Sequence, residues 1–168
     1  MTSKKRREEI IKLLINNNSA IKGTKLAELF SVTRQIIVKD IAILRAEGKN
    51  IIATPDGYIL NEDINKVKTI IAVNHNSKET MEELEIVVKY GGMIEDVIIE
   101  HPLYGELRGN LMIKNLNDLN KFEKEYNNNN AKPLSNLTNG IHLHTIAADS
   151  AEDIEEIKRE LKERGFLL

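Results

Sequence analysis

The pattern of apolar and polar residues in the first 60 positions predicts three helices followed by a hairpin. Apolar residues recur at spacings of three and four in three stretches that each follow a capping Ser or Thr, at residues 3–18, 25–30 and 34–47. Two short apolar runs then follow, at residues 50–53 and 57–60. They are joined by Thr54-Pro55-Asp56-Gly57, a strong turn signal. This order is typical of a winged helix-turn-helix domain.

The pattern in the rest of the chain predicts strands and helices in the order βαββαβα. Strand patterns lie at residues 67–75, 93–100, 107–113 and 140–146, and amphipathic helix patterns at residues 77–90, 118–127 and 150–164. The order predicts an α+β fold, specifically a ferredoxin-like sandwich in which an antiparallel sheet carries helices on one face. Because the stretch 61–66 is polar, we expect it to link two domains, residues 1–61 and residues 67–168.

Composition excludes several classes of protein. The chain has 168 residues, of which 41% are apolar, enough for one large core or two small ones. It has no cysteine, which excludes disulfides, thiolate zinc sites and a thiol nucleophile. No apolar signal region follows the basic N-terminus, and no apolar run reaches membrane-spanning length. We therefore expect a cytoplasmic protein without a membrane partner.

The net charge of −2 conceals an asymmetry between the two predicted domains. Residues 1–60 carry 11 Lys and Arg against 6 Asp and Glu, a balance of +5. Residues 61–168 carry 13 against 20, a balance of −7. A small basic domain on a larger acidic one favours a nucleic-acid-binding head on a sensing or assembly body, with chance variation in surface charge as the alternative.

The third predicted helix supplies the residues expected to read operator DNA. Its first turns would face the major groove, where Arg and Gln make bidentate contacts to guanine and adenine, through Thr33, Arg34, Gln35 and Lys39. Contacts to phosphates are expected from Lys4, Lys5, Arg6, Lys25 and Arg45. The alternative is a winged helix that contacts protein. The run Leu26-Ala27-x-x-Phe30-x-Val32-Thr33-Arg34-Gln35, with Val38-x-Asp40-Ile41-x-x-Leu44-Arg45 after it, resembles the winged-helix modules of bacterial repressors.

The strand Gly140-Ile141-His142-Leu143-His144-Thr145-Ile146 carries candidate metal chemistry. Side chains two apart on a strand leave from the same face, so His142 and His144 point the same way. Neutral imidazole is the commonest nitrogen ligand of transition metals in proteins, so this pair would form half of a metal site. The alternative is a pair of solvated histidines on a half-exposed strand. The chain's other two histidines, His75 and His101, also lie at ends of predicted strands.

Three features of the second domain together resemble one family. They are His75 with Glu83, the block Val97-Ile98-Ile99-Glu100-His101-Pro102-Leu103-Tyr104-Gly105-Glu106, and Pro133-Leu134-Ser135-x-Leu137-Thr138-x-Gly140-x-His142-Leu143-His144-Thr145-Ile146. They are similar to the 3H domain. Joined to a winged helix, this domain resembles the niacin-responsive transcriptional repressors. The resemblance covers nearly the whole chain.

The resemblance implies a repressor of genes for niacin salvage, transport or NAD synthesis, with nicotinic acid as co-repressor. It implies one divalent transition metal, nickel, zinc or iron, held by His75, Glu83, His142 and His144. Three nitrogens and one oxygen suit these metals, and an open coordination position would take a carboxylate or a pyridine nitrogen. For Glu83 alone, without the resemblance, the residues favour a solvated helix position among Glu79, Glu82 and Glu85. His101 and Tyr104 are candidate effector contacts, although His101 is also unremarkable as an exposed strand end.

Winged-helix repressors read two half-sites as two-fold dimers, and this chain has no long heptad run. We therefore expect a homodimer formed through residues 67–168. Two other classes compete with the repressor. The first is a metal-dependent hydrolase with a DNA-binding head, in which Glu100 or Glu106 would serve as acid or base beside a metal-activated water. The second is an enzyme like the biotin ligases, whose Gly- and Arg-rich ATP loop this sequence lacks.

Overall fold

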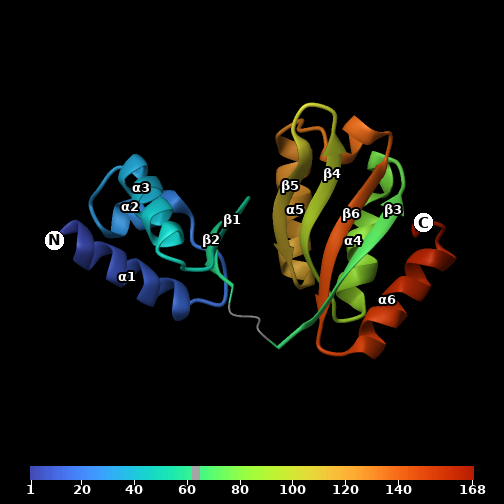
Figure 1. Cartoon of the computed structure of the whole chain (residues 1–168), viewed down its shortest axis with the longest axis horizontal. Coiled ribbons are helices and arrows are strands. Elements are labelled where there is room, and N and C mark those ends of the chain that lie inside the picture. Colours follow the sequence, from blue (N-terminus) through green and yellow to red (C-terminus); the bar gives the residue numbers. More distant parts are fainter. Residues whose placement is uncertain (62–64) are drawn as a thin grey trace. The chain divides into compact units, whose positions relative to one another are not determined.

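A computed structural model describes residues 1–61 and 65–168 of the chain. Residues 62–64, which belong to the predicted link, lie outside the described residues. The chain divides into two compact units between residues 63 and 64, called here the head and the regulatory unit (Figure 1). No described helix is long and apolar enough to cross a membrane.

The head contains the three helices and the hairpin that the sequence predicts. Its elements are α1 Ser3–Ile15, α2 Gly23–Leu29, α3 Arg34–Ala46, β1 Ile51–Thr54 and β2 Gly57–Leu60. The Thr33 hydroxyl accepts a hydrogen bond from the backbone N–H of Ile36 and so caps the recognition helix α3, as predicted. Helix α1 is instead capped by Thr2, one residue earlier than Ser3.

The core of the head is made by the apolar stripes of the three helices and by β1. Its buried members are Ile10, Leu14, Leu26, Ala27, Ile37, Ile41, Leu44 and Ile51. Ile21 adds a bridge to Tyr58, which ties the loop after α1 to the hairpin. Because the core takes one face of α3, the residues on its other face are free to contact a partner.

The regulatory unit has the predicted order of elements. Its elements are β3 Val67–Asn74, η1 Ser77–Glu79, α4 Thr80–Lys89, β4 Met93–His101, β5 Gly105–Ile113, α5 Leu116–Asn128, η2 Leu134–Thr138, β6 Ile141–Ala148 and α6 Ala151–Glu163. The 3-10 turn η2 lies in a stretch expected to be a loop. The mixture of helices and strands in this unit confirms the predicted α+β class.

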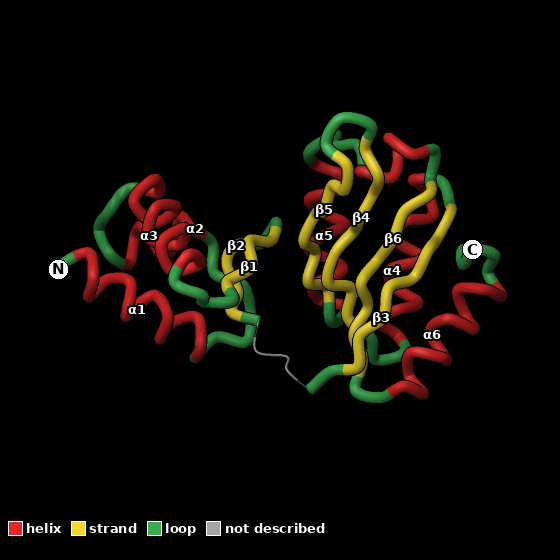
Figure 2. The backbone as a smooth tube through the Cα atoms, viewed as in Figure 1, coloured by secondary structure: helices red, strands yellow, loops and turns green. Residues whose placement is uncertain are grey.

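The four strands form one antiparallel sheet in the order β3-β6-β4-β5 (Figure 2). In a ferredoxin-like sandwich the third strand of the domain lies between the first two. Here the fourth strand, β6, takes that place. The order of elements along a chain does not determine which strands pair, so the predicted class is correct while this detail of the topology differs.

One face of the sheet is covered by α4, α5 and α6 and forms the core (Figure 1). Alternate residues of β3 and β6, including Ile71, Val73 and Ile146, point into it and are at most 3% exposed. The residues between them, such as Ile70 and Leu143, lie on the opposite face, which no helix of this unit covers. Because β6 has its even-numbered residues on the core side, His142 and His144 face inward.

Candidate metal centre

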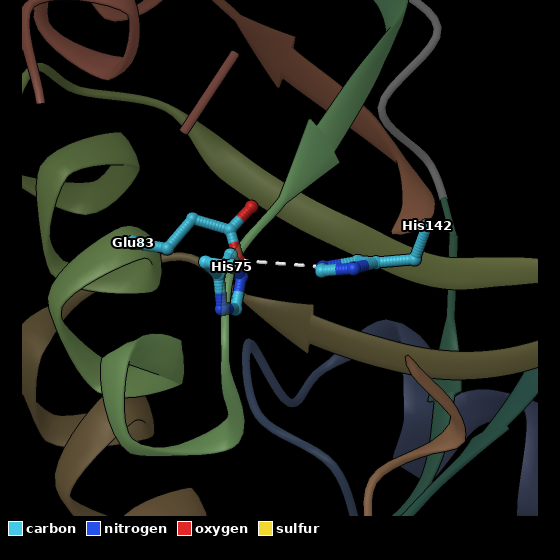
Figure 3. Close-up of side chains that lie close together, drawn as sticks. All are labelled: His75, Glu83 and His142. Atoms are coloured by element: carbon cyan, nitrogen blue, oxygen red, sulfur yellow. Dashed lines mark hydrogen bonds and ion pairs between the residues drawn. The ribbon is translucent and has the colours of Figure 1, made fainter. Parts of the chain in front are cut away.

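Three elements bring the four predicted ligands together. His75 directly follows β3, Glu83 lies on the core face of α4, and His142 and His144 lie on β6. The register of β3 and β6 pairs Val73 with His142 and Ile71 with His144, so both imidazoles sit on the inner face. Figure 3 shows Glu83 reaching from its helix between His75 and His142.

The four side chains form a compact buried cluster, with Glu83 at its centre. His75 Nε2 is 2.5 Å from Glu83 Oε2, His142 Nε2 is 3.5 Å from the same oxygen, and His144 Nε2 is 3.2 Å from Oε1. The ligand atoms of His75, Glu83 and His142 all lie within 4.8 Å of one another. The exposed fraction of each of the four side chains is between 0% and 4%. This burial excludes the alternative in which they are solvated surface residues.

The orientation of the three rings is set by the backbone. The Nδ1 atom of each histidine lies 2.5–2.8 Å from a carbonyl oxygen, that of Asn76 for His75, Gly140 for His142 and Asp96 for His144. A carbonyl only accepts, so each Nδ1 carries a proton and donates it. Each Nε2 is therefore directed at Glu83, with a lone pair when the ring is neutral and with an N–H when the ring is protonated, and His75 Nε2 lies at hydrogen-bond distance from Glu83 Oε2.

Converging lone pairs and a carboxylate repel one another unless a cation lies between them. In the described part of the chain, Glu83 Oε1 and His144 Nε2 are buried without a hydrogen-bond partner. Buried polar atoms in native structures almost always have a partner, and a bound metal would supply one here. Three imidazole nitrogens and a carboxylate, each ring held by a backbone carbonyl, form a donor set that suits Zn²⁺, Ni²⁺ or Fe²⁺.

Protons are the cations available to the cluster without a metal. Burial alone would lower the pKa of His75 and of His144, but the hydrogen bond and charge of Glu83 outweigh it and raise both pKa values. Burial alone would raise the pKa of Glu83, but the charge of His144 and the other two imidazoles hold that pKa well below its usual range. The metal-free cluster therefore keeps an ionised carboxylate and binds protons on its rings.

Two residues that sequence reasoning did not single out shape the cluster. Asp96 lies where the pairing of β4 with β6 shifts register, and its carboxylate accepts hydrogen bonds from the Thr145 N–H and from Arg108. That arrangement places the backbone carbonyl oxygen of Asp96 within hydrogen-bond distance of His144 Nδ1. Gly140 has a φ of +94°, and a Cβ there would collide with the carbonyl oxygen of His75. The glycine was visible in the sequence, but the close approach that requires it was not.

The expected open coordination position belongs to a bound metal and stays a prediction. His75, Glu83, His142 and His144 would supply four protein donors, the number that structural metal sites use, whereas catalytic sites keep a position for water. Phe166 closes the cluster further, with its ring centroid 5.4 Å from that of His75. The geometry therefore favours a centre that organises the protein around it over one that activates a water molecule.

The predicted effector residues His101 and Tyr104 lie apart from the cluster in the hairpin between β4 and β5. His101 Nδ1 accepts hydrogen bonds from the N–H groups of Leu103 and Tyr104, and its ring lies beside that of Tyr104. Tyr104 is 68% exposed. Among the described residues, no hydrogen bond or ring contact joins this hairpin to the four candidate ligands. The observed role of His101 is to cap a turn.

The predicted DNA contacts fall on the surface of the head, with one exception. The exposed set comprises Thr33, Arg34, Gln35, Lys39, Lys4, Lys5, Lys25 and Arg45. Arg6 differs because it is only 8% exposed and its guanidinium lies 2.6 Å from the buried carboxylate of Asp40. This buried ion pair holds α1 against α3, so Arg6 positions the recognition helix and is not available for the phosphate contact predicted for it.

A helix-turn-helix head joined to a sheet domain with an enclosed His and Glu cluster defines a DNA-binding regulator. Residues 68–168 match the 3H domain family, and residues 6–59 match a helix-turn-helix domain family. The chain belongs to the family of transcription repressors that combine these two domains. The sequence resemblance to this family is therefore confirmed.

Two relatives that match nearly the full chain agree with this assignment. The chain is 45% identical over 163 residues to "Probable transcription repressor NiaR" of Thermotoga maritima, covering 97% of this chain and 93% of the relative. It is 36% identical over 167 residues to "Transcription repressor NadR" of Bacillus subtilis, with the same coverage. Both are named as repressors, which confirms the expectation of a regulator rather than an enzyme.

The effect of pH on stability should be opposite in the metal-free and metal-loaded proteins. Raised histidine pKa values stabilise the metal-free fold below about pH 6.5, and this contribution is lost as pH rises through the raised values. Because the pKa of Glu83 is lowered, its ionised carboxylate stabilises the fold above about pH 4.5. This contribution to stability is lost only when the pH falls through the lowered pKa. A metal needs proton-free Nε2 atoms, so the rise in Tm on adding Ni²⁺ or Zn²⁺ should grow between about pH 6 and pH 8.

Differential scanning calorimetry of chelated and metal-loaded protein across this range measures the effect. Glu83→Gln should remove most of the metal-dependent rise in Tm. The matched variant Glu85→Gln, on an exposed position of the same helix, should keep it. A metal-dependent rise that stays constant with pH, or that survives in Glu83→Gln, would contradict this account of the cluster.

Proposed function

We propose that the protein represses genes of niacin or NAD metabolism or transport, as a dimer that binds operator DNA with nicotinic acid as co-repressor and one divalent metal in the regulatory unit. The observation that carries the proposal is the buried cluster in which three Nε2 lone pairs converge on Glu83. A metal there would hold β3, α4 and β6 together. The effector comes from the resemblance to niacin-responsive repressors.

The head supports operator binding through the exposed face of α3. Arg34, Gln35 and Lys39 lie on its exposed face, and the capped start of the helix lets its first turn enter a major groove. The hairpin β1–β2 would form the wing. Lys4 and Lys5 at the start of α1, with Lys25 and Arg45, supply charges for phosphates.

The hydrolase alternative loses support from the geometry. Water activation requires an open metal position, and all four candidate ligands are enclosed. Glu100 and Glu106 lie at the hairpin end of β4 and β5 and line one cavity with His142, but neither has a described hydrogen bond or ion pair with the cluster.

The predicted recognition helix gives a prediction for operator binding. Arg34→Ala and Gln35→Ala should each weaken binding to a selected operator by about 1–3 kcal/mol if their side chains read bases. Lys4→Ala should weaken binding to all sequences alike and reduce the slope of affinity against salt concentration by about one. Fluorescence anisotropy with operator and scrambled duplexes distinguishes these effects. An intact operator affinity in the double variant Arg34→Ala, Gln35→Ala would show that another surface reads the DNA.

The uncovered face of the sheet gives a prediction for dimerisation. Ile70 is 57% exposed on this face of β3, and Leu143 and Ile141 extend the apolar surface across β6. Exposed apolar patches of this kind are typical of interaction sites. The full chain should sediment as a dimer at micromolar concentration, and Ile70→Glu should shift it to monomer.

Leu116→Glu is the matched control for this experiment. Leu116 is 56% exposed at the start of α5, so the same charge is introduced at the same exposure away from the uncovered face. Its variant should remain dimeric. A monomeric native protein, or a dimer that tolerates Ile70→Glu, would exclude this face as the dimer interface.

The role of the metal in regulation is tested by His144→Ala. The variant should lose bound metal, and nicotinate should then no longer tighten operator binding, because a ligand changes DNA affinity only through contacts that differ between two states. Effector-free DNA binding should stay nearly unchanged, which also shows that the head is folded. His101→Ala is the control, since His101 caps a turn outside the cluster. A metal-free His144→Ala protein that responds fully to nicotinate would separate the metal from the switch.

A further inference from the structure

Residues 165–168, which follow α6, turn back and pair with the edge of β3 that β6 does not cover (Figure 1). We call these residues the strap. An antiparallel bridge and two backbone hydrogen bonds of 2.9 and 3.0 Å join it to β3, between Val73 and Leu167, from the Asn74 N–H to the Phe166 carbonyl, and from the Leu168 N–H to the Ala72 carbonyl. The strap therefore closes the outer edge of the sheet with its backbone.

Phe166 places the strap over one ligand of the cluster. Its side chain belongs to the core of the regulatory unit, and the residue is 5% exposed. Its ring meets that of His75 at an interplanar angle of 62°, with 5.4 Å between the centroids. The Phe166 carbonyl also binds the backbone of Asn74, the residue before His75. Both the backbone and the ring of Phe166 thus cover the ligand that follows β3.

The cavities next to the cluster do not expose its ligand atoms. His75 lines a cavity of about 790 Å³, and His142 lines another of about 750 Å³. The side chains of these two residues are nevertheless only 1% and 3% exposed, and that of Glu83 is 0% exposed. A metal ion therefore has access to the Nε2 atoms and the carboxylate only after part of the surrounding wall has moved.

The strap is the part of this wall that can move at the lowest cost. The ligands themselves are carried by β3, α4 and β6, whose inner faces form the core. The strap has two described backbone hydrogen bonds to β3 and begins at Gly165, which has a φ of +77°. Arg164, just before it, pairs with Glu82 of α4 at 3.1 Å, which keeps the end of α6 in place. Segments with few hydrogen bonds open locally at a lower free energy than the core.

We propose that the strap is a gate for the metal centre, which opens by releasing β3 and withdrawing Phe166 from His75 while the rest of the unit stays folded. The proposal rests on the proposed function for the presence of a metal, and it adds the route of exchange. The strap supplies none of the four candidate ligands, so opening it costs the same whether the cluster is empty or loaded. It therefore sets the rates of metal uptake and release, and not the affinity.

Gly165→Ala in the full-length protein tests the gate. An alanine is strained at this positive φ, and a Cβ there would meet no described heavy atom within 4 Å, so the variant disfavours the closed strap without a collision. Ni²⁺ uptake, and Ni²⁺ release to excess EDTA, should both become about 5- to 30-fold faster, with Kd unchanged. Stopped-flow absorbance measures the two rates, and competition with a chromophoric chelator measures Kd.

Gly91→Ala is the matched control. Gly91 follows α4 with a φ of +79°, and a Cβ there also meets no described heavy atom within 4 Å. This variant introduces the same strain into the same unit but away from the strap, so it should keep the native rates. Faster release in both variants would show that exchange requires unfolding of the whole unit. Faster release in Gly165→Ala with slower or unchanged uptake and a weaker Kd would show that the strap positions a ligand. Either result would overturn the gate.

Amide hydrogen exchange in chelated protein measures strap opening without any metal. The N–H groups of Asn74 and Leu168, which join the strap to β3, should exchange faster than that of Thr145, which is bound by the Asp96 carboxylate inside the sheet. Gly165→Ala should speed the first two by about 5- to 30-fold and leave Thr145 unchanged. Equal exchange rates at all three positions would show that the strap does not open by itself and would overturn the proposal.

The outcomes separate the gate from the proposed function. If the native protein binds no Ni²⁺, the metal of the proposed function and the gate both fail. If it binds Ni²⁺ and Gly165→Ala exchanges the metal at native rates, the gate alone fails and the proposed function stands.

Discussion

The regulatory unit depends on one buried interaction, the carboxylate of Glu83 among three imidazoles. A fully buried carboxylate is unfavourable unless opposite charge compensates it, and here the compensation has to come from a metal or from protons on the rings. The three backbone carbonyls that accept the Nδ1 protons leave the rings little freedom to turn away. The three elements that carry the ligands are therefore held in one arrangement by the cation that the cluster binds.

This arrangement explains why the centre suits regulation better than catalysis. Reactive metal sites keep a position for water, whereas a metal held by these four buried residues would act as a cross-link between a helix and two strands. A cross-link of this kind changes the shape of the surfaces next to it when the metal binds or leaves.

In the head, a buried ion pair likewise holds two elements, α1 and α3, in one arrangement. Asp40 on α3 is 2% exposed and is paired with Arg6 on α1 at 2.6 Å, with Arg7 at 3.5 Å. Loss of one partner from such a pair typically costs about 3–5 kcal/mol, so the orientation of the recognition helix depends on it. The other basic residues predicted to contact DNA stay exposed on the surface of the head, while Arg6 contributes by holding α3 in place.

Features that follow from local periodicity and local chemistry could be predicted from the amino-acid sequence. Helical spacing and the Thr33 cap located the recognition helix, and period-two alternation placed His142 and His144 on one face of a strand. Family motifs then pointed to His75 and Glu83. These features involve residues a few positions apart, where the backbone period alone decides which side chains share a face.

The way in which distant segments meet could not be predicted from the sequence and follows from the folded structure. It placed β6 between β3 and β4, brought the carbonyl of Asp96 to a histidine 48 positions later, buried Arg6 against Asp40 and enclosed the cluster. It also brought Phe166 onto His75 and left His101 to cap a turn. Strand pairing, burial and long-range hydrogen bonds depend on packing between elements, and no local period of the sequence encodes them.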